Sequence, residues 1–344
     1  MASLGALKRS MALTLILIFG LLFALLVVIS MLVQWYMESN FFPFWIQIVF
    51  IIGITVLFVL IQWAISPGII RWSSRLKYLE PGENPFLEST VRELCDKTGV
   101  PMPRLAVSPD KTPNAFVFGR TQKSATLAVH QGLLETLNRD EIRAVLAHEV
   151  GHLKHNDMVV MTVVSVVPLL AFMLARSILW GGGRRDRDAG GLIIAAIIGY
   201  AVYFISQLMI LKLSRQREFY ADTFSAVTTE NPHALSSALA KITYGLSLSK
   251  DKPGAARSFY IGDPVTARRE IASIMQNRNA YDLDGDGVLD ERELNLAMEA
   301  EAKRKRGREI MSTHPSTFRR IQLLKEIEED IKHGGGGENI YRHI

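Results

Sequence analysis

The sequence predicts a mainly α-helical integral membrane protein, with four hydrophobic segments and an α-rich part outside the membrane that contains a small β-hairpin. Three observations predict this class. Four apolar runs are long enough to cross a bilayer, one helical stretch carries two histidines four residues apart, and another stretch alternates apolar and polar residues as a hairpin does. We therefore expect membrane helices to interrupt a single folded domain.

The four apolar runs cover residues 13–35, 44–65, 158–180 and 192–213. A helix of about 20 residues crosses the roughly 30 Å of hydrocarbon in a bilayer. The first run is too long for a signal-peptide core and no small-residue cleavage site follows it, so we expect a retained anchor. Pro168 is expected to break the third run. The alternative for the third and fourth runs is a buried hairpin in a large soluble core.

The motif HEVGH at residues 148–152 predicts a metal site. Residues four apart lie on one face of a helix, so His148 and His152 can bind one zinc ion, and Glu149 can act as general base toward a water molecule. Asn138 and Glu141 predict the helix start, as an N-cap with its reciprocal partner. The alternative is a helix with two solvated histidines.

A catalytic zinc ion usually has three protein ligands, so a further ligand is needed. Glu218 and Asp222 lie four residues apart on a second predicted helix. Glu218 can supply the third ligand, and Asp222 can accept the outer N–H of a ligating histidine. The alternative is an ordinary charged helix face, since Arg215 and Arg217 are adjacent.

Residues 114–118 and 125–130 alternate in polarity around a turn at 119–123, which predicts a β-hairpin. An extended peptide can add to the exposed edge of such a hairpin through main-chain hydrogen bonds. Cleavage would then be only loosely specific for sequence. His130 is expected to be a strand residue and not a ligand.

With HEVGH, EFYAD and a membrane hairpin between them, the chain resembles the HtpX-type membrane zinc metalloproteases, relatives of the CAAX prenyl endopeptidases. PNAF at 113–116 and HPSTFRRI at 314–321 match the family as well. The resemblance implies an α-rich metalloprotease domain of the gluzincin type. It also implies that the zinc ligands are His148, His152 and Glu218, that Glu149 is the base and that Asp222 supports a ligand.

The resemblance also implies that His314 and Arg320 face the developing oxyanion, and that Asn114, Ala115 and Phe116 hold the substrate backbone. From the residues alone, Arg320 is equally compatible with a solvated helix position, and His314 with a helix start that has proline at its first position. The family implies quality-control cleavage of misfolded or damaged membrane proteins, or of unfolded polypeptides, at the lipid bilayer of a bacterial cytoplasmic membrane.

Basic residues predict the orientation, because they concentrate on the cytoplasmic side. They flank the first membrane hairpin at Lys8, Arg9, Arg71, Arg75 and Lys77, whereas the connection 36–43 carries only Glu38. The N-terminus and the catalytic domain are therefore expected in the cytoplasm. Three arginines within 184–187 conflict with this unless the third and fourth segments do not fully cross.

Residues 282–293, DLDGDGVLDERE, match an EF-hand calcium loop, with glycine at its sharp turn. The expected ligands are Asp282, Asp284, Asp286, the carbonyl of Val288, Asp290 and Glu293. A solvated acidic turn is the alternative. Residues 249–308 look like an insertion into the family pattern. Our hypothesis is that calcium orders the helices leading to His314 and Arg320.

The expected domains are a transmembrane hairpin at 10–66, a metalloprotease domain in two parts at 67–156 and 214–333, a second membrane hairpin at 157–213, and a flexible tail at 334–344. The net charge of +5 suits an anionic membrane surface, and nothing in it predicts nucleic-acid binding.

The single Cys95 excludes an internal disulfide and is expected to be buried.

The rival function is a calcium-responsive membrane scaffold or binding protein with a structural metal site. Glu149 favours the enzyme, since a structural site needs no base.

Overall fold

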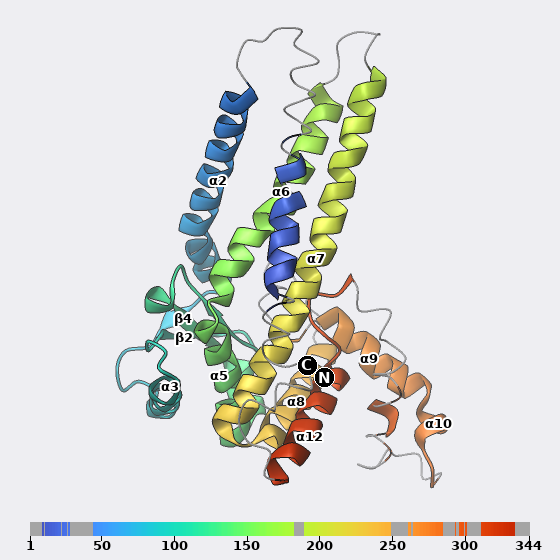
Figure 1. The fold of residues 1–344 in the computed structure, drawn as a ribbon. Coiled ribbons are helices and arrows are strands. Elements are labelled where there is room, and N and C mark those ends of the chain that lie inside the picture. The colour runs from blue at the N-terminus through green and yellow to red at the C-terminus, as the bar shows by residue number, and fades with distance from the viewer. Residues whose placement is uncertain are drawn as a thin grey trace. The chain divides into compact units, whose positions relative to one another are not determined.

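The computed structural model describes residues 9, 11–21, 23–25, 27, 44–181, 189–248, 261–262, 264–284, 293, 296–298, 300 and 311–333 (Figure 1). The chain divides into two compact units. Unit 1 comprises residues 1–7, 67–158 and 214–344, and unit 2 comprises residues 8–66 and 159–213. At residues 66–67, 158–159 and 213–214 the polypeptide therefore passes from one unit to the other within a helix.

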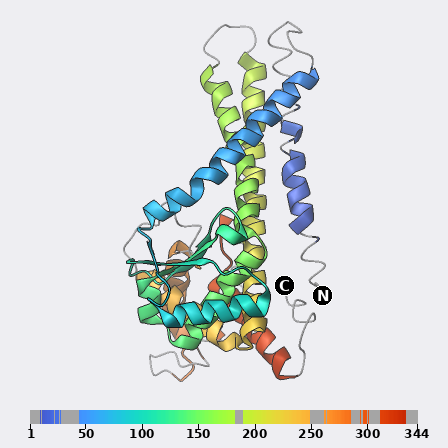
Figure 2. The same ribbon diagram turned by 90° about the vertical axis from the view of Figure 1, so that its left-hand side faces the viewer.

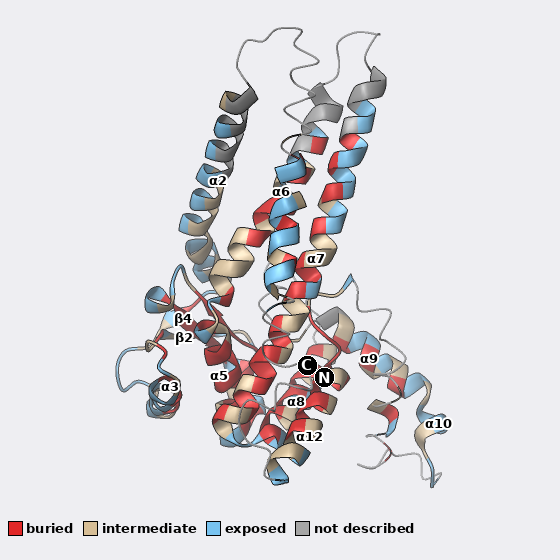
Figure 3. Ribbon diagram, in the orientation of Figure 1, coloured by how far each residue is buried: buried red, intermediate tan, exposed pale blue. Residues whose placement is uncertain are grey.

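Unit 2 is built from apolar helical segments: the described residues of Met11–Leu25, and parts of α2 (Phe44–Ser73), α6 (Asp157–Gly181) and α7 (Ala189–Thr229). Large apolar side chains such as Leu57 and Ile197 stay exposed on these helices (Figure 3). An apolar exterior suits lipid and not water.

Two helical segments of the described residues, Val56–Ser73 and Ala196–Thr229, are each long and apolar enough to cross a membrane. α6 passes the same test only together with the helix before it, across a bend of 60°. The prediction of four spanning segments is thus confirmed only in part. Residues 28–35, the end of the first predicted segment, and the connection 36–43 lie outside the described residues.

The predicted break at Pro168 is wrong, because α6 continues through this residue. Proline removes only one backbone donor, and neighbouring helical bonds remain in place in an apolar helix. Pro67 lies inside α2 in the same way. Proline therefore does not end the helix at either position.

Unit 1 contains a four-stranded sheet in the order β1-β2-β4-β3 (Figure 2). Its strands are β1 (Lys77–Tyr78), β2 (Arg104–Ser108), β3 (Ala115–Phe118) and β4 (Thr126–His130). β3 and β4 pair antiparallel, which confirms the predicted hairpin. β2 pairs parallel with β4, a contact that the sequence analysis did not predict. β3 is consequently an edge strand of this sheet.

Except for the short helix at 278–281, the remaining helices of unit 1 contribute side chains to one apolar core. The core includes Leu127 of the sheet together with Val145, Leu235 and Leu324 from three helices. Burying each such side chain stabilises the fold by roughly 1.5–3 kcal/mol. These helices are α3 (Pro85–Thr98), α4 (Gln131–Thr136), α5 (Arg139–Lys154), α8 (Pro232–Leu248), α9 (Pro264–Gln276), α10 (Arg278–Tyr281) and α12 (Thr317–Lys332).

Helix α5 begins as the sequence predicts. The Asn138 side chain accepts a hydrogen bond from the Glu141 N–H at 2.9 Å, and the Glu141 carboxylate accepts one from the Asn138 N–H at 2.8 Å. The apolar stripe of the helix, including Val145 and Val150, is buried in the core. Cap and stripe together fix the rotation of α5, and hence the direction in which its histidines point.

Candidate metal centre and active site

Three side chains from two helices converge in unit 1. His148 and His152 lie one turn apart on α5, and their Nε2 atoms are 3.1 Å apart. Glu218, on α7, places its Oε2 3.7 Å from His148 Nε2 and its Oε1 3.5 Å from His152 Nε2. The structure therefore brings together the three predicted zinc ligands.

A close approach of α5 and α7 makes this convergence possible. A Cβ atom on Gly151 would lie 3.0 Å from the ring of Phe224 on α7. Nearby, the hydroxyl of Ser225 donates to the carbonyl of Ala144 at 2.7 Å. A glycine inside the HEVGH motif thus leaves room for the helix that carries Glu218.

The outer nitrogens of both histidines contact carboxylates. His148 Nδ1 lies 3.0 Å from Asp222 Oδ1, and His152 Nδ1 lies 2.6 Å from Asp157 Oδ2. An ionised carboxylate can only accept, so each Nδ1 carries the proton. Each Nε2 therefore presents a lone pair toward Glu218 and the other ring.

This arrangement fits a divalent metal ion. Two imidazole lone pairs that face each other at 3.1 Å repel unless a cation lies between them. In a tetrahedral zinc site with Zn–N bonds of about 2.0–2.1 Å, ligand nitrogens lie about 3.3–3.4 Å apart. Two histidines and one glutamate are, moreover, a donor set found in catalytic zinc sites. His148, His152 and Glu218 would hold the ion.

The buried charges around the three ligands point the same way. Four buried carboxylates, those of Glu149, Asp157, Glu218 and Asp222, lie near two buried guanidinium groups, those of Arg217 and Arg320. When all are ionised they leave a charge of −2, which a divalent cation would neutralise. Without such a cation, burying this charge costs free energy, and this cost disfavours the ionised form of the carboxylates.

Glu149 shows this cost. It is 3% exposed, and burial, followed by the negative charge of Glu218, raises its pKa well above the usual range. The Val117 N–H on β3 donates to its carboxylate and opposes the shift. A cation held by the neighbouring ligands would lower the pKa further toward the ionised form that a general base requires.

Arg320 and His314 also lie at the centre. Arg320 is 1% exposed and donates from Nε and Nη2 to Asp222 at 2.8 and 2.7 Å, while its Nη1 lies 3.2 Å from Glu218 Oε2. Nη1 also donates to the carbonyl of Ile261 at 2.5 Å. Burial would lower the pKa of Arg320, but the charges of Asp222 and Glu218 raise it overall. The alternative of a solvated helix residue is therefore wrong.

His314 Nε2 lies 4.0 Å from Glu218 Oε1, and its ring contacts Thr313 through Nδ1 at 3.0 Å. It precedes α12, whose N-cap is Ser316, so the alternative of a helix start with proline at its first position is wrong. An oxyanion role for His314 and Arg320 stays a prediction. In this structure Arg320 contacts Asp222, Glu218 and the carbonyl of Ile261.

The predicted substrate-binding residues lie on or beside the edge strand. Ala115 and Phe116 belong to β3 and are buried. Asn114 is buried too; its carbonyl accepts from the His130 N–H at 2.9 Å and its side-chain oxygen accepts from the Ile261 N–H at 3.0 Å. Asn114 thus fixes the start of β3, and a direct role in holding substrate stays a prediction.

Two residues of this centre were missed in the sequence analysis. Asp157 follows the HEVGH motif and opens α6, and Arg217 directly precedes Glu218. Their signal was a charged residue at the border of an apolar run, where burial is expected to require a partner. Arg217 was instead read as a sign of a solvated helix face, whereas it is 4% exposed.

The predicted calcium loop is described in part. Asp282, Asp284 and Glu293 can each offer an oxygen to one ion, with these atoms within 4.8 Å of one another. Glu293 is buried and accepts from the N–H groups of Leu283 and Asp284 at 2.5 and 3.3 Å. The other expected ligands, Asp286, Val288 and Asp290, lie outside the described residues.

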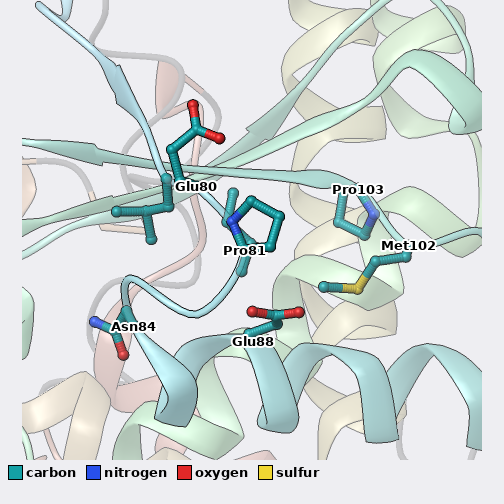
Figure 4. A pocket seen from close by; sticks show the side chains of 8 residues that line it. Glu80, Pro81, Asn84, Glu88, Met102 and Pro103 are labelled. Carbon is teal, nitrogen blue, oxygen red and sulfur yellow. The ribbon is translucent and has the colours of Figure 1, made fainter.

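A small hollow of about 120 Å³ lies at the start of α3 and is lined in part by Pro81, Met102 and Pro103 (Figure 4). Of its polar side chains, Asn84 caps α3, and Glu88 accepts from the Gly82 N–H at 2.9 Å.

Comparison with known proteins agrees with this geometry. Residues 81–328 match "Peptidase family M48". A "Protease HtpX homolog" of Methanothermobacter thermautotrophicus is 38% identical over 252 residues, which cover 73% of this chain and 92% of that protein. "Protease HtpX homolog 2" of Methanosarcina acetivorans is 38% identical over 278 residues, covering 79% and 82%. The "Protease HtpX homolog" of Moorella thermoacetica is 31% identical over 277 residues, again covering 79% and 82%.

The matched region contains HEVGH, Glu218, Asp222 and the segment at 314–321. Most of the chain and most of each relative are covered, so the similarity concerns the whole protein and not one motif. The chain belongs to peptidase family M48, among its HtpX-like membrane metalloproteases.

Proposed function

We propose that the protein is a zinc-dependent endopeptidase that hydrolyses peptide bonds at a membrane. The observation that supports this most directly is the convergence of His148, His152 and Glu218 beside Glu149. A bound zinc ion would supply a Lewis acid that polarises the scissile carbonyl and makes a water molecule easier to deprotonate.

Glu149 would take the proton of the attacking water and return it to the leaving amine. The edge strand β3 supports this placement, since the Val117 N–H already reaches the Glu149 carboxylate. An extended substrate pairing with this edge would lie along β3 with its backbone near the base. Main-chain pairing requires that the substrate segment be unfolded. Because it does not involve the side chains, it implies little sequence preference.

The test is Glu149→Gln in the full-length protein purified in detergent. Loss of the base is expected to lower peptide hydrolysis by about 10²–10⁴-fold, while one zinc ion per chain remains by metal analysis. Glu93→Gln changes an exposed carboxylate and serves as the control. Hydrolysis that survives in Glu149→Gln would contradict the role of Glu149 as base, and a zinc-loaded wild-type protein that hydrolyses no peptide would favour the rival scaffold function.

We further propose that the substrates are misfolded or damaged membrane proteins and unfolded polypeptides, and that the catalytic unit faces the cytoplasm. The need for an extended segment at β3 supports the substrate class, and the basic residues that flank the first membrane hairpin support the orientation. Several relatives come from archaea, so the expected bacterial membrane stays a prediction. Faster cleavage of an unfolded membrane protein than of its folded form would support the substrate class.

A second candidate function is calcium binding at 282–293. Convergence of Asp282, Asp284 and Glu293 supports it. Residues on both sides of the loop contact α12, the helix that carries Arg320, because Ile274 and Ala297 form a buried cluster with Phe318. Calcium would thereby influence the position of α12.

Calcium binding is tested by titrating the zinc-loaded protein and following both heat release and peptide hydrolysis. Saturable binding that changes hydrolysis, and is lost in Asp284→Asn, is the expected result. Binding without a change in hydrolysis would leave a structural ion only, and no binding would remove the proposal.

A further inference from the structure

Each metal-facing histidine is backed by a carboxylate, and each carboxylate is backed by an arginine. In the first chain of contacts His148 is followed by Asp222 and Arg320. In the second, His152 Nδ1 lies 2.6 Å from Asp157 Oδ2, and Asp157 Oδ1 lies 2.5 Å from Arg217 Nη2. The second chain has the same order of groups as the first, but its carboxylate and arginine lie on α6 and α7, whereas those of the first lie on α7 and α12.

Fold stability alone is a weak explanation for the second chain. Asp157 and Arg217 are 8% and 4% exposed, so both charges have lost most of their hydration. A buried ion pair often stabilises a fold no better than two apolar side chains of similar volume. Breaking the pair on one side only would, in contrast, leave an uncompensated buried charge.

The chemistry of His152 gives a better explanation. Because Asp157 accepts a hydrogen bond from Nδ1–H, Nε2 keeps its lone pair directed toward His148 and Glu218. A carboxylate at the outer nitrogen also makes an imidazole a stronger metal ligand. Arg217 fixes the rotamer of Asp157 through its other oxygen and precedes the third ligand, Glu218, on α7.

We propose that Asp157 and Arg217 are positioning residues of the metal centre, which hold His152 in its ligating tautomer and orientation. The inference rests on the proposed zinc site. The family resemblance assigns the support of a ligating histidine only to Asp222; the inference adds Asp157 and Arg217 as the support of His152. The ion pair also ties the start of α6 to α7, the helix that carries the third ligand.

The experiment compares full-length proteins in detergent by two measurements, the zinc dissociation constant in competition with a chelator and the melting temperature of the zinc-free protein. The variants are Asp157→Asn and the double variant Asp157→Asn/Arg217→Gln. The second removes both charges and leaves no unpaired ion. The matched control is Glu93→Gln/Arg143→Gln, which removes a partly exposed carboxylate–arginine pair that contacts neither ligating histidine.

Asp157→Asn is expected to weaken zinc binding by about 10–100-fold. The double variant should regain the melting temperature of the zinc-free wild-type protein to within a few degrees and still bind zinc at least about tenfold more weakly. The control should match wild type in both measurements. Arg217→Lys, which keeps the charge, should bind zinc within a few-fold of wild type.

A double variant that melts like wild type and binds zinc equally tightly would overturn the inference, because the pair would then be structural only. If the double variant does not fold, Asp157→Asn decides the question, since it keeps the shape and one acceptor oxygen; an unchanged dissociation constant would overturn the inference. A wild-type protein that binds no zinc would instead contradict the proposed function.

Discussion

At the residue scale, Glu141 links the start of the catalytic helix to α8. Its buried carboxylate accepts from the Asn138 N–H, from the Ser237 hydroxyl at 2.6 Å and from Lys241 at 2.7–2.8 Å. Burial would raise the pKa of Glu141, but these hydrogen bonds lower it overall below 4.5. The ionised carboxylate is therefore bound more favourably in the folded state than in the unfolded state.

Glu141→Gln is expected to lower the free energy of unfolding by roughly 1–2 kcal/mol at neutral pH, because it removes the charge-assisted bonds. A carboxyl whose folded pKa is depressed contributes stability above its unfolded value, here about 4.5, and loses it as pH falls through the folded pKa. The difference between wild type and variant should shrink below that pH in denaturant titrations. The exposed Glu135→Gln is the control; a constant difference across pH would contradict the assignment.

Some residues of the centre were predictable and others were not. HEVGH specifies its geometry within one helix, and Glu218 with Asp222 repeats the four-residue spacing. Asp157 and Arg217, however, are recognisable only when α6 and α7 meet, since the contact joins positions far apart in the chain. Pair contacts of this kind depend on tertiary packing, which spacing does not encode.

At the element scale, the crossing of α5 and α7 determines whether the third ligand reaches the histidines. Gly151→Val would place a branched side chain against Phe224, where even a Cβ atom has only 3.0 Å. α7 is expected to move outward, and zinc binding should weaken by about tenfold or more because Glu218 moves with it.

The matched control is Gly68→Val on α2, where a Cβ atom meets nothing within 4 Å. Zinc affinity measured by chelator competition should be unchanged in this control. Equal affinity in Gly151→Val and wild type would show that the helices can repack without moving Glu218.

The elements themselves followed from periodicity to different degrees. The capped α5 and the hairpin of β3 and β4 were predictable because each is local in sequence. The short β1 and the parallel pairing of β2 with β4 were not, since parallel pairs join distant segments and carry no turn signal. α6 continues through Pro168 because, in an apolar environment, the backbone groups have no hydrogen-bond partners better than those within the helix.

At the scale of the whole molecule, the metal is expected to stabilise unit 1. Its buried centre carries an excess of negative charge when the carboxylates are ionised, so ion binding and folding are coupled. A ligand present at about a thousand times its dissociation constant stabilises the folded state by about 4 kcal/mol.

Removal of zinc with a chelator should therefore lower the melting temperature of the full-length protein by several degrees, and added zinc should restore it. Glu218→Gln, which lacks one charged ligand, should respond weakly to both treatments. Identical melting of loaded and stripped wild-type protein would argue against a metal that couples to the fold.

The near-complete burial of His148, Glu149 and Glu218 has a kinetic consequence. An ion enclosed in this way can leave only when the surrounding structure opens for a moment. The bound ion should then exchange with the medium at the rate of this opening, and adding more chelator should not change that rate. Purified protein would therefore keep its metal ion through long dialysis, because local opening is slow and not only because the affinity is high.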